Sequence, residues 1–299
     1  MRIFITGATG FIGSAVTKEL IGSGHEVLGM TRSEAGAAQL TALGATPHHG
    51  SLEDLDSIRR GAAAADAVIH LAFNHDFSRY VQNCEDDRRV IEAIGEVLAG
   101  SDRRLIVTSG SAMARGQAGR PAREDDPPSS SAVSPRAASE EAVNAAAERG
   151  VHACVVRLPQ VHDPVKQGLV TYVVQLAREK GLSPYIGSGD CRWPAAHVSD
   201  VARLYRLALE KGEAGARYHA VAEEGVPMRE IAGVIGQGLG VPVQSIPQEE
   251  APAHFGWLSM FTTHDMPASS AWTREQLGWQ PTGPGLIADL RAMDYARSV

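Results

Sequence analysis

Three glycines near the N-terminus have a spacing that suits the binding of a phosphate group. They stand at positions 7, 10 and 13, in a G-x-x-G-x-x-G pattern between an apolar run and a helical pattern. Glycines placed in this way allow a tight turn, let a pyrophosphate approach backbone N–H groups, and let the helix pack closely on the strand. The helix N-terminus adds unpaired N–H donors and a partial positive charge. The expected contacts with a dinucleotide here are Gly7, Thr9, Gly10, Phe11, Ile12 and Gly13.

The residues after the second apolar run bear on which dinucleotide would bind. The run Glu26–Met30 is followed by Thr31, Arg32 and Ser33. A guanidinium with flanking hydroxyls binds a 2′-phosphate through charge-assisted hydrogen bonds, whereas the carboxylate common at this place would repel it. This favours NADP(H) over NAD(H), with Arg32 and Ser33 as contacts. The alternative is that Arg32 makes a surface ion pair and that Glu34 serves the ribose.

Short apolar runs alternate with longer amphipathic stretches along the first half of the chain. The alternation predicts an α/β fold in which helices cover both faces of a parallel, doubly wound sheet. Beyond residue 160 the pattern weakens, which suggests a smaller C-terminal lobe. The predicted strands are Arg2–Thr6, Glu26–Met30, Ala67–Ala72, Arg104–Thr108 and Ala153–Leu158, and the predicted helices include Phe11–Gly22, Ala35–Leu43 and segments at about 169–181, 199–211, 228–239, 269–278 and 285–298.

Two shorter segments are expected at the edges of this pattern. Ser51 is predicted to cap a helix, with Asp54 as the acidic partner three residues on. Ser51 and Leu52 are also predicted to contact the cofactor. The proline- and serine-rich segment Gly116–Pro135 is expected to be a loop over the C-terminal edge of the sheet rather than a linker between domains.

Composition excludes several classes of protein. The 299 residues include 28 Lys and Arg against 35 Asp and Glu, which leaves no basic field to attract nucleic acid. The three cysteines lie far apart without C-x-x-C spacing, so neither a disulfide framework nor a zinc site is predicted, and no other metal site is expected. No apolar stretch approaches the roughly 18 residues of a membrane span, and no signal-peptide pattern opens the chain. We therefore expect a cytoplasmic protein of about two domains with a sizeable core.

Several segments occur in the order and spacing of the extended short-chain dehydrogenase/reductases, an epimerase/dehydratase-like family. The segments are Thr6–Gly13, Asp66–Ala72, Leu105–Ser111, Arg157–Pro159 and His197–Asp200, and Leu277–Pro281 resembles the family's C-terminal signature. The resemblance covers nearly the whole chain. It implies an NADP-binding Rossmann domain of residues 1–160 with a return contribution from about 197–222, and a smaller substrate-binding lobe of residues 161–196 and 223–299. It also implies cofactor contacts at Leu71, Ala72, Leu158 and Pro159.

The family's usual catalytic pair has no match in this sequence. In the family a tyrosine transfers the substrate proton, and a lysine four residues later lowers the pKa of that tyrosine and holds the nicotinamide ribose. None of the six tyrosines here has a lysine four residues on. Counting back from the helix end at Glu148–Gly150 puts the lysine position near Arg136 and the tyrosine position near Ala132. Arg136 is expected to keep the contact with the ribose, although a guanidinium cannot shuttle a proton.

Delivery of a hydride to a carbonyl, enone or imine needs an acid near the acceptor, or a water that supplies the proton. By the resemblance, Ser111 matches the family's serine or threonine after the fifth strand and is expected to hydrogen-bond a substrate carbonyl. His75 and Tyr80 follow the fourth strand, and His162 follows Arg157–Pro159, so each is a candidate acid. For each of these three, a structural role is the alternative. His197 and Asp200 are interpreted as a cap of the next helix rather than as catalytic groups.

Aromatic and apolar side chains gather in the segment beyond residue 160. They include the run Phe255–Phe261 and Met266. They predict an apolar substrate, or equally the core of the smaller lobe or a partner interface. Arg192 is expected to bind a substrate carboxylate or to pair with Asp190. The predicted substrate contacts are Phe73, Met113, Tyr185, Arg192, Trp193, Phe255 and Trp257.

Together these features predict an NADP(H)-dependent oxidoreductase of the family's atypical branch. It would reduce a small or medium apolar carbonyl, enone or imine-type compound. That branch also includes isomerases and NADP-sensing regulators, so an isomerase or epimerase and a non-catalytic NADP sensor stay as alternatives. The expected partner is a small molecule, not nucleic acid or a membrane, and a homodimer is left open.

Overall fold

A central parallel sheet accounts for the apolar runs of the first half of the chain. The protein is described by a computed structural model that covers residues 1–114, 116 and 119–297. The sheet consists of β1 (Arg2–Thr6), β2 (Glu26–Thr31), β3 (Thr46–His49), β4 (Ala67–His70), β5 (Arg104–Gly110), β6 (His152–Leu158) and β10 (Arg217–His219). All neighbours are parallel, in the order β10-β6-β5-β4-β1-β2-β3. The strand order reverses between β1 and β4, and ligands bind at such a reversal.

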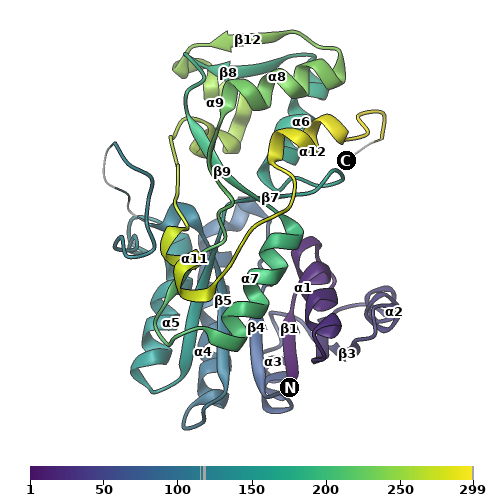
Figure 1. Ribbon diagram of the computed structural model, residues 1–299, viewed down its shortest axis with the longest axis vertical. Coiled ribbons are helices and arrows are strands. Elements are labelled where there is room, and N and C mark those ends of the chain that lie inside the picture. Colours follow the sequence, from purple (N-terminus) through teal and green to yellow (C-terminus); the bar gives the residue numbers. More distant parts are fainter. Residues whose placement is uncertain (115, 117–118, 298–299) are drawn as a thin grey trace.

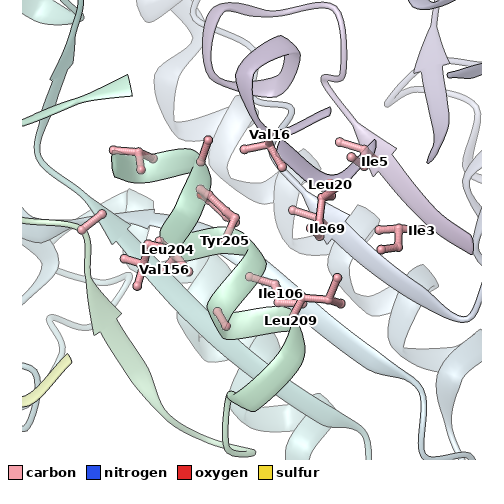
Figure 2. Close-up of a cluster of buried hydrophobic side chains, with 14 of the residues drawn as sticks. Ile3, Ile5, Val16, Leu20, Ile69, Ile106, Val156, Leu204, Tyr205 and Leu209 are labelled. Carbon is pink, nitrogen blue, oxygen red and sulfur yellow. The ribbon is translucent and has the colours of Figure 1, made fainter. Parts of the chain in front are cut away.

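Successive side chains along each strand point to opposite faces of this sheet, so a hydrophobic core forms on both faces. On β1, Ile3 and Ile5 belong to one buried cluster, whereas Phe4 belongs to another. The first cluster packs under α1 (Phe11–Gly22) and α7 (Val198–Lys211), as Figure 2 shows. The second packs under α3 (Leu55–Ala63), α4 (Tyr80–Leu98) and α5 (Ala138–Glu148). The period of two along a strand thus produces the two covered faces that the sequence predicts.

Helix α1 has the predicted bounds, whereas the cap expected at Ser51 is wrong. Asp54 is the N-cap of α3, and its carboxylate accepts a hydrogen bond from the N–H of Ser57 at 3.0 Å. Helix α2 (Glu34–Ala42) begins one residue before its predicted start, because the hydroxyl of Ser33 caps it by accepting from Gly36 N–H. Both caps satisfy N–H groups that the helix itself leaves unpaired.

The smaller lobe stands above the carboxyl ends of the strands (Figure 1). Its two small sheets have the orders β11-β9-β7 and β12-β8. Trp193 and Phe255 are fully buried in its core, so these two side chains pack inside the lobe. The elements are β7 (Gln160–His162), α6 (Leu169–Lys180), β8 (Ser183–Ile186), β9 (Arg192–His197), β11 (Glu223–Pro227), α8 (Met228–Leu239), β12 (Val243–Ile246), α9 (Ala251–Phe255), α10 (Ser259–Thr262) and α12 (Leu286–Ala292).

One part of the predicted C-terminal lobe packs on the large sheet instead. Helix α11 (Ala271–Leu277) lies low in Figure 1, beside the sheet. Its Trp272 stacks on Tyr218 of β10 with ring centroids 5.5 Å apart, and the indole of Trp279 donates to the carbonyl of Asp200 at 2.9 Å. Burial of these aromatic side chains therefore packs α11 against the large sheet. Helix α12 is shorter than the predicted segment 285–298, whose last residue lies outside the described residues.

One of the two residues predicted to cap α7 does so. The cap expected at His197 is confirmed, since its ring accepts from Ser199 N–H at the start of α7. Asp200 has another role, because its carboxylate accepts from the N–H groups of Thr282 and Gly283 at 2.9 Å. Among the helices that the structure describes, none is long and apolar enough to cross a membrane.

A buried ion pair holds α5 against β6. The guanidinium of Arg157 donates two 2.8 Å hydrogen bonds to the carboxylate of Glu140, and their side chains are 0% and 1% exposed. Arg217 also donates to this carboxylate, at 3.0 Å. Such a pair is weak evidence for stability as a unit, but removal of one partner leaves a buried charge without compensation.

The substitution Glu140→Gln is expected to lower the free energy of unfolding by about 3–5 kcal/mol, because Arg157 keeps its charge in the core. Urea denaturation measures the change. The matched control is Glu96→Gln, which removes the exposed partner of Arg59 at 3.1 Å and should cost less than about 1 kcal/mol. Equal effects of the two substitutions would contradict this account of the pair.

Candidate functional site

A cavity of about 760 Å³ runs from the glycine motif to the smaller lobe. It lies at the carboxyl ends of β1, β2, β4 and β5, where the strand order reverses. The predicted residues that line it are Gly7, Thr9, Gly10, Phe11, Ile12, Gly13, Arg32, Leu52, Leu71, Ala72, Phe73, His75, Ser111, Leu158 and Pro159. The predicted residues that do not line it are Ser33, Ser51, Tyr80, Met113, Arg136, His162, Tyr185, Arg192, Trp193, Phe255 and Trp257.

The glycines form a cradle that side chains would fill. Gly7 has φ +71°, and a Cβ on it would lie 2.9 Å from the backbone nitrogen of Ala72. A Cβ on Gly13 would lie 2.0 Å from the carbonyl oxygen of Gly7. Within the described chain, the N–H groups of Phe11, Ile12 and Gly13 donate to no acceptor. The cradle therefore fits a pyrophosphate, which these N–H groups and the helix dipole would hold.

Arg32 lies at the β2 end of this cavity with its charge available. Its side chain is exposed to the cavity and makes no ion pair or hydrogen bond with the described residues. The alternative partner for a ribose, Glu34, is directed to His49, at 3.9 Å between Oε1 and Nε2. Ser33 uses its hydroxyl as the cap of α2. The surface ion pair of Arg32, which the sequence left open as an alternative, is thus not formed with any described residue.

Two of the candidate catalytic residues line the cavity. Ser111 is 7% exposed, and its hydroxyl forms no hydrogen bond within the described chain. His75 lies between the rings of Phe73 and Phe77, with centroids 5.5 and 6.2 Å away. Desolvation, then the positive charge of Arg136, lowers the pKa of His75. A neutral imidazole therefore predominates at pH 7, and it can still donate a hydrogen bond.

The other two candidates lie away from the cavity lining. Burial and the neighbouring Cys84 thiol raise the pKa of Tyr80 to about 12, so its hydroxyl stays protonated. His162 is fully buried, and its Nδ1 lies 2.6 Å from a carboxylate oxygen of Asp289 on α12. Since neither side chain reaches the cavity in this geometry, His75 and Ser111 are the better placed pair.

Arg136 lies behind the cavity wall rather than in it. Its guanidinium donates to Asp87 at 2.8 Å and to the carbonyl of Thr108 at 2.9 Å, and it stacks 4.3 Å above the ring centroid of Phe73. The guanidinium does not line the cavity in this structure, so the ribose contact expected for Arg136 stays a prediction. Arg136 instead positions Phe73, which does line the cavity.

A buried chain of polar groups leads from Arg136 back to the cradle. The second oxygen of Asp87 lies 2.9 Å from His70 Nε2, and His70 Nδ1 lies 2.7 Å from the hydroxyl of Thr6. That hydroxyl accepts from the N–H groups of Leu71 and Ala72 at 3.2 Å, so it donates its own proton to His70. Despite burial, the charge of Arg136 and the hydrogen bonds from His70 and Ser139 lower the pKa of Asp87 to about 2.

The smaller lobe contributes a wall that the sequence prediction found in part: Phe261 and Met266 belong to the apolar set that it singled out, whereas Tyr172 and Lys166 were missed. Tyr172, Phe261, Met266 and Lys166 line the cavity, whereas Tyr185 and Trp257 do not. Trp257 is 40% exposed and stacks on Phe77 with centroids 4.2 Å apart. Met113 is buried in the loop after β5. The three-residue spacing of Leu169 and Tyr172 at the start of α6, which puts them on one face, is the signal that could have found Tyr172.

Arg192 is held by a neighbour in the smaller lobe. It donates to the carboxylate of Asp265 at 2.8 and 3.0 Å. The pairing expected with Asp190 is wrong, because Asp190 pairs with Arg229. Arg192 is therefore a partly exposed ion-pair residue, outside the cavity lining.

The parallel sheet and the glycine cradle at its reversal define a Rossmann-type nucleotide-binding protein. The chain belongs to the NAD-dependent epimerase/dehydratase family, whose model matches residues 3–222. It is thus one of the extended short-chain dehydrogenase/reductases, a family that supports NAD(P)-dependent oxidoreductase, epimerase or dehydratase activity.

Similar proteins cover nearly the whole chain. An uncharacterized protein of Schizosaccharomyces pombe is 49% identical over 99% of this chain and 100% of its own length. A 4-hydroxy-2-methyl-3-oxo-4-farnesyl-3,4-dihydroquinoline-1-oxide ketoreductase of Stigmatella aurantiaca is 26% identical over 86% of this chain and 80% of its own. The crystal structure of a dTDP-glucose 4,6-dehydratase of Streptomyces venezuelae has a TM-score of 0.77 at 20% identity, covering 98% of this chain and 96% of that one. That last likeness establishes the shared fold.

The substitution Gly13→Ala is expected to weaken binding of NADPH and NADH alike by at least about tenfold, since the methyl group displaces the Gly7 carbonyl and distorts the cradle. Isothermal titration calorimetry measures both affinities. Gly22→Ala is the matched control on the same helix, because its Cβ would meet nothing within 4 Å. Unchanged dinucleotide affinity in Gly13→Ala would place the binding site elsewhere.

Proposed function

We propose that the chain is an NADP(H)-dependent reductase of a small or medium carbonyl, enone or imine-type compound with an apolar body. The observation that carries the proposal is one continuous cavity that joins the unpaired Arg32, the glycine cradle, and the pair Ser111 and His75. Arg32 would bind the 2′-phosphate through charge-assisted hydrogen bonds. The ketoreductase name of the Stigmatella aurantiaca relative supports reduction.

The residues around the acceptor would divide the chemical work. The bound cofactor would supply the hydride. Ser111 and His75 would donate hydrogen bonds to the acceptor oxygen or nitrogen, and protonated His75 would give up the proton. Tyr172, Phe261 and Met266 would hold the apolar body and exclude water from the reacting atoms. Arg136 would act indirectly, since it fixes the ring of Phe73.

The purified protein tests this proposal directly. NADPH consumption is followed with a panel of ketones, enones, quinones and imines, and product formation is measured in parallel. Turnover of one compound class with matching NADPH loss is expected. NADPH binding without turnover over the whole panel would overturn the proposal in favour of a sensor. Substrate conversion without net NADPH loss would overturn it in favour of an isomerase or epimerase.

The substitution Arg32→Asp is expected to weaken NADPH binding by about 1.5–3 kcal/mol more than NADH binding, because it replaces a charge-assisted partner of the 2′-phosphate by a repelling carboxylate. Calorimetric titration of both cofactors measures the difference. NADH binding is the internal control, since NADH lacks that phosphate. An equal loss for both cofactors would remove the argument for NADP(H).

His75 predicts a pH dependence of the reduction. The acid must be protonated, and burial together with Arg136 and Lys166 lowers its pKa below 6.5. The value of kcat/KM for reduction should therefore fall as pH rises through an apparent pKa below 6.5. His75→Gln keeps a hydrogen-bond donor without titrating, so it should remove this dependence and reduce kcat about 100-fold. A pH profile that is unchanged in the variant would assign the acid to another group.

A further inference from the structure

Lys166 brings a positive charge to the substrate end of the cavity. The chain has four lysines. Lys180 and Lys211 donate their ammonium protons to backbone carbonyls. The ammonium groups of Lys18 and Lys166 are exposed and have no hydrogen bond or ion pair with the residues that the structure describes, and of these two side chains it is that of Lys166 that lines the cavity. Lys166 therefore presents a solvent-exposed ammonium group at the substrate end of the cavity.

The backbone that carries Lys166 is fixed in place. One carboxylate oxygen of Asp163 accepts from the N–H groups of Val165 and Lys166, each at 2.7 Å. Asp163 N–H donates to the carbonyl of Lys166 at 2.9 Å, and the buried amide of Gln167 donates to the carbonyl of Asp163. Since the turn is already ordered, binding restricts only the flexible side chain, which lowers the entropic cost of a contact.

No acidic residue lines this end of the cavity among the described residues. The charged residues at the other end are Arg32 and Glu53, which follow β2 and β3. Near Lys166 the lining groups are Gln160, His75 and the apolar wall of the smaller lobe. The N–H of Leu169 at the start of α6 already donates to the side chain of Gln160. Lys166 is thus the group available here to compensate a negative charge.

We infer that the substrate of this site carries a carboxylate that pairs with Lys166 while its apolar body packs on Tyr172, Phe261 and Met266. The inference rests on the proposed reductase function and names its substrate as an oxo acid. A neutral apolar substrate would strip water from the ammonium group without compensation, whereas an anion restores the lost interaction. One lysine supplies a single positive charge, which balances the single charge of a carboxylate, whereas a phosphomonoester carries about −1.5 to −2 at pH 7.

The test compares straight-chain oxo acids with their methyl esters, which differ in the charge. The unmodified protein should favour the acids in KM. Lys166→Met keeps most of the apolar side chain, and it should raise KM for the acids about 10- to 100-fold while it leaves KM for the esters and the affinity for NADPH nearly unchanged. Lys166→Arg should retain most of the preference. Lys18→Met, on the exposed side of α1, is the matched control and should change nothing.

Binding measurements separate this inference from the reductase proposal. Calorimetry of the same acids with the NADP⁺-loaded protein should show the same dependence on Lys166, whether or not turnover occurs. Acid binding that depends on Lys166 without reduction would support the carboxylate site and overturn the reductase. Acids that bind no better than esters would overturn the carboxylate site. A loss of NADPH affinity in Lys166→Met would overturn it too, because Lys166 would then serve the cofactor.

Discussion

The buried carboxylate of Asp87 is the constraint on which the candidate site depends. It is 2% exposed, and it lies between His70 on one side and Arg136 on the other. A carboxylate in such a place is stable only when charged and hydrogen-bonding partners replace its water. Those partners come from β4 and from the short helical turn Pro135–Ala137 before α5, so one side chain of α4 ties together two segments on one side of the strand-order reversal.

The two ends of the cavity are joined through this carboxylate. On one side, His70 is hydrogen-bonded to the hydroxyl of Thr6. That hydroxyl also accepts from the N–H of Ala72, which faces Gly7. On the other side, the guanidinium of Arg136 stacks on the ring of Phe73, which contacts the candidate acid His75. The geometry at the phosphate cradle and the geometry at the reacting end are therefore set by one polar network.

Local sequence patterns predicted the sheet lobe well, because its strands and the glycine turn depend on residues that are close together in the sequence. The glycine spacing gave the cradle, and Ile3, Phe4 and Ile5 gave the alternation of a strand. The strand β3 was missed, since its sequence Thr46-Pro-His-His49 has no apolar run and its pairing with β2 uses only backbone groups. β3 forms by pairing with the free edge of β2, and that edge exists only once the rest of the sheet has assembled.

Contacts distant in sequence explain most of the errors at the site. His162 looked available beside the family motif, but its partner Asp289 is 127 residues away. Trp193 and Phe255 were equally suited to a core and to a binding wall, and tertiary packing assigned them to the core. The identity of Tyr172 and Met266 as lining residues likewise depends on how the two lobes meet. Residue type alone does not decide between these environments.

The stack of Phe77 on Trp257 makes the tryptophan fluorescence sensitive to the contact between the two lobes. Phe77 comes from the sheet lobe and Trp257 from the smaller lobe, and their rings lie beside two lining residues of the cavity, His75 and Tyr172. The other tryptophans are Trp193 and Trp279, both fully buried, and Trp272, which stacks within the sheet lobe. A change in intrinsic fluorescence on ligand binding would therefore originate mainly at Trp257, and it would report the approach or separation of the two lobes.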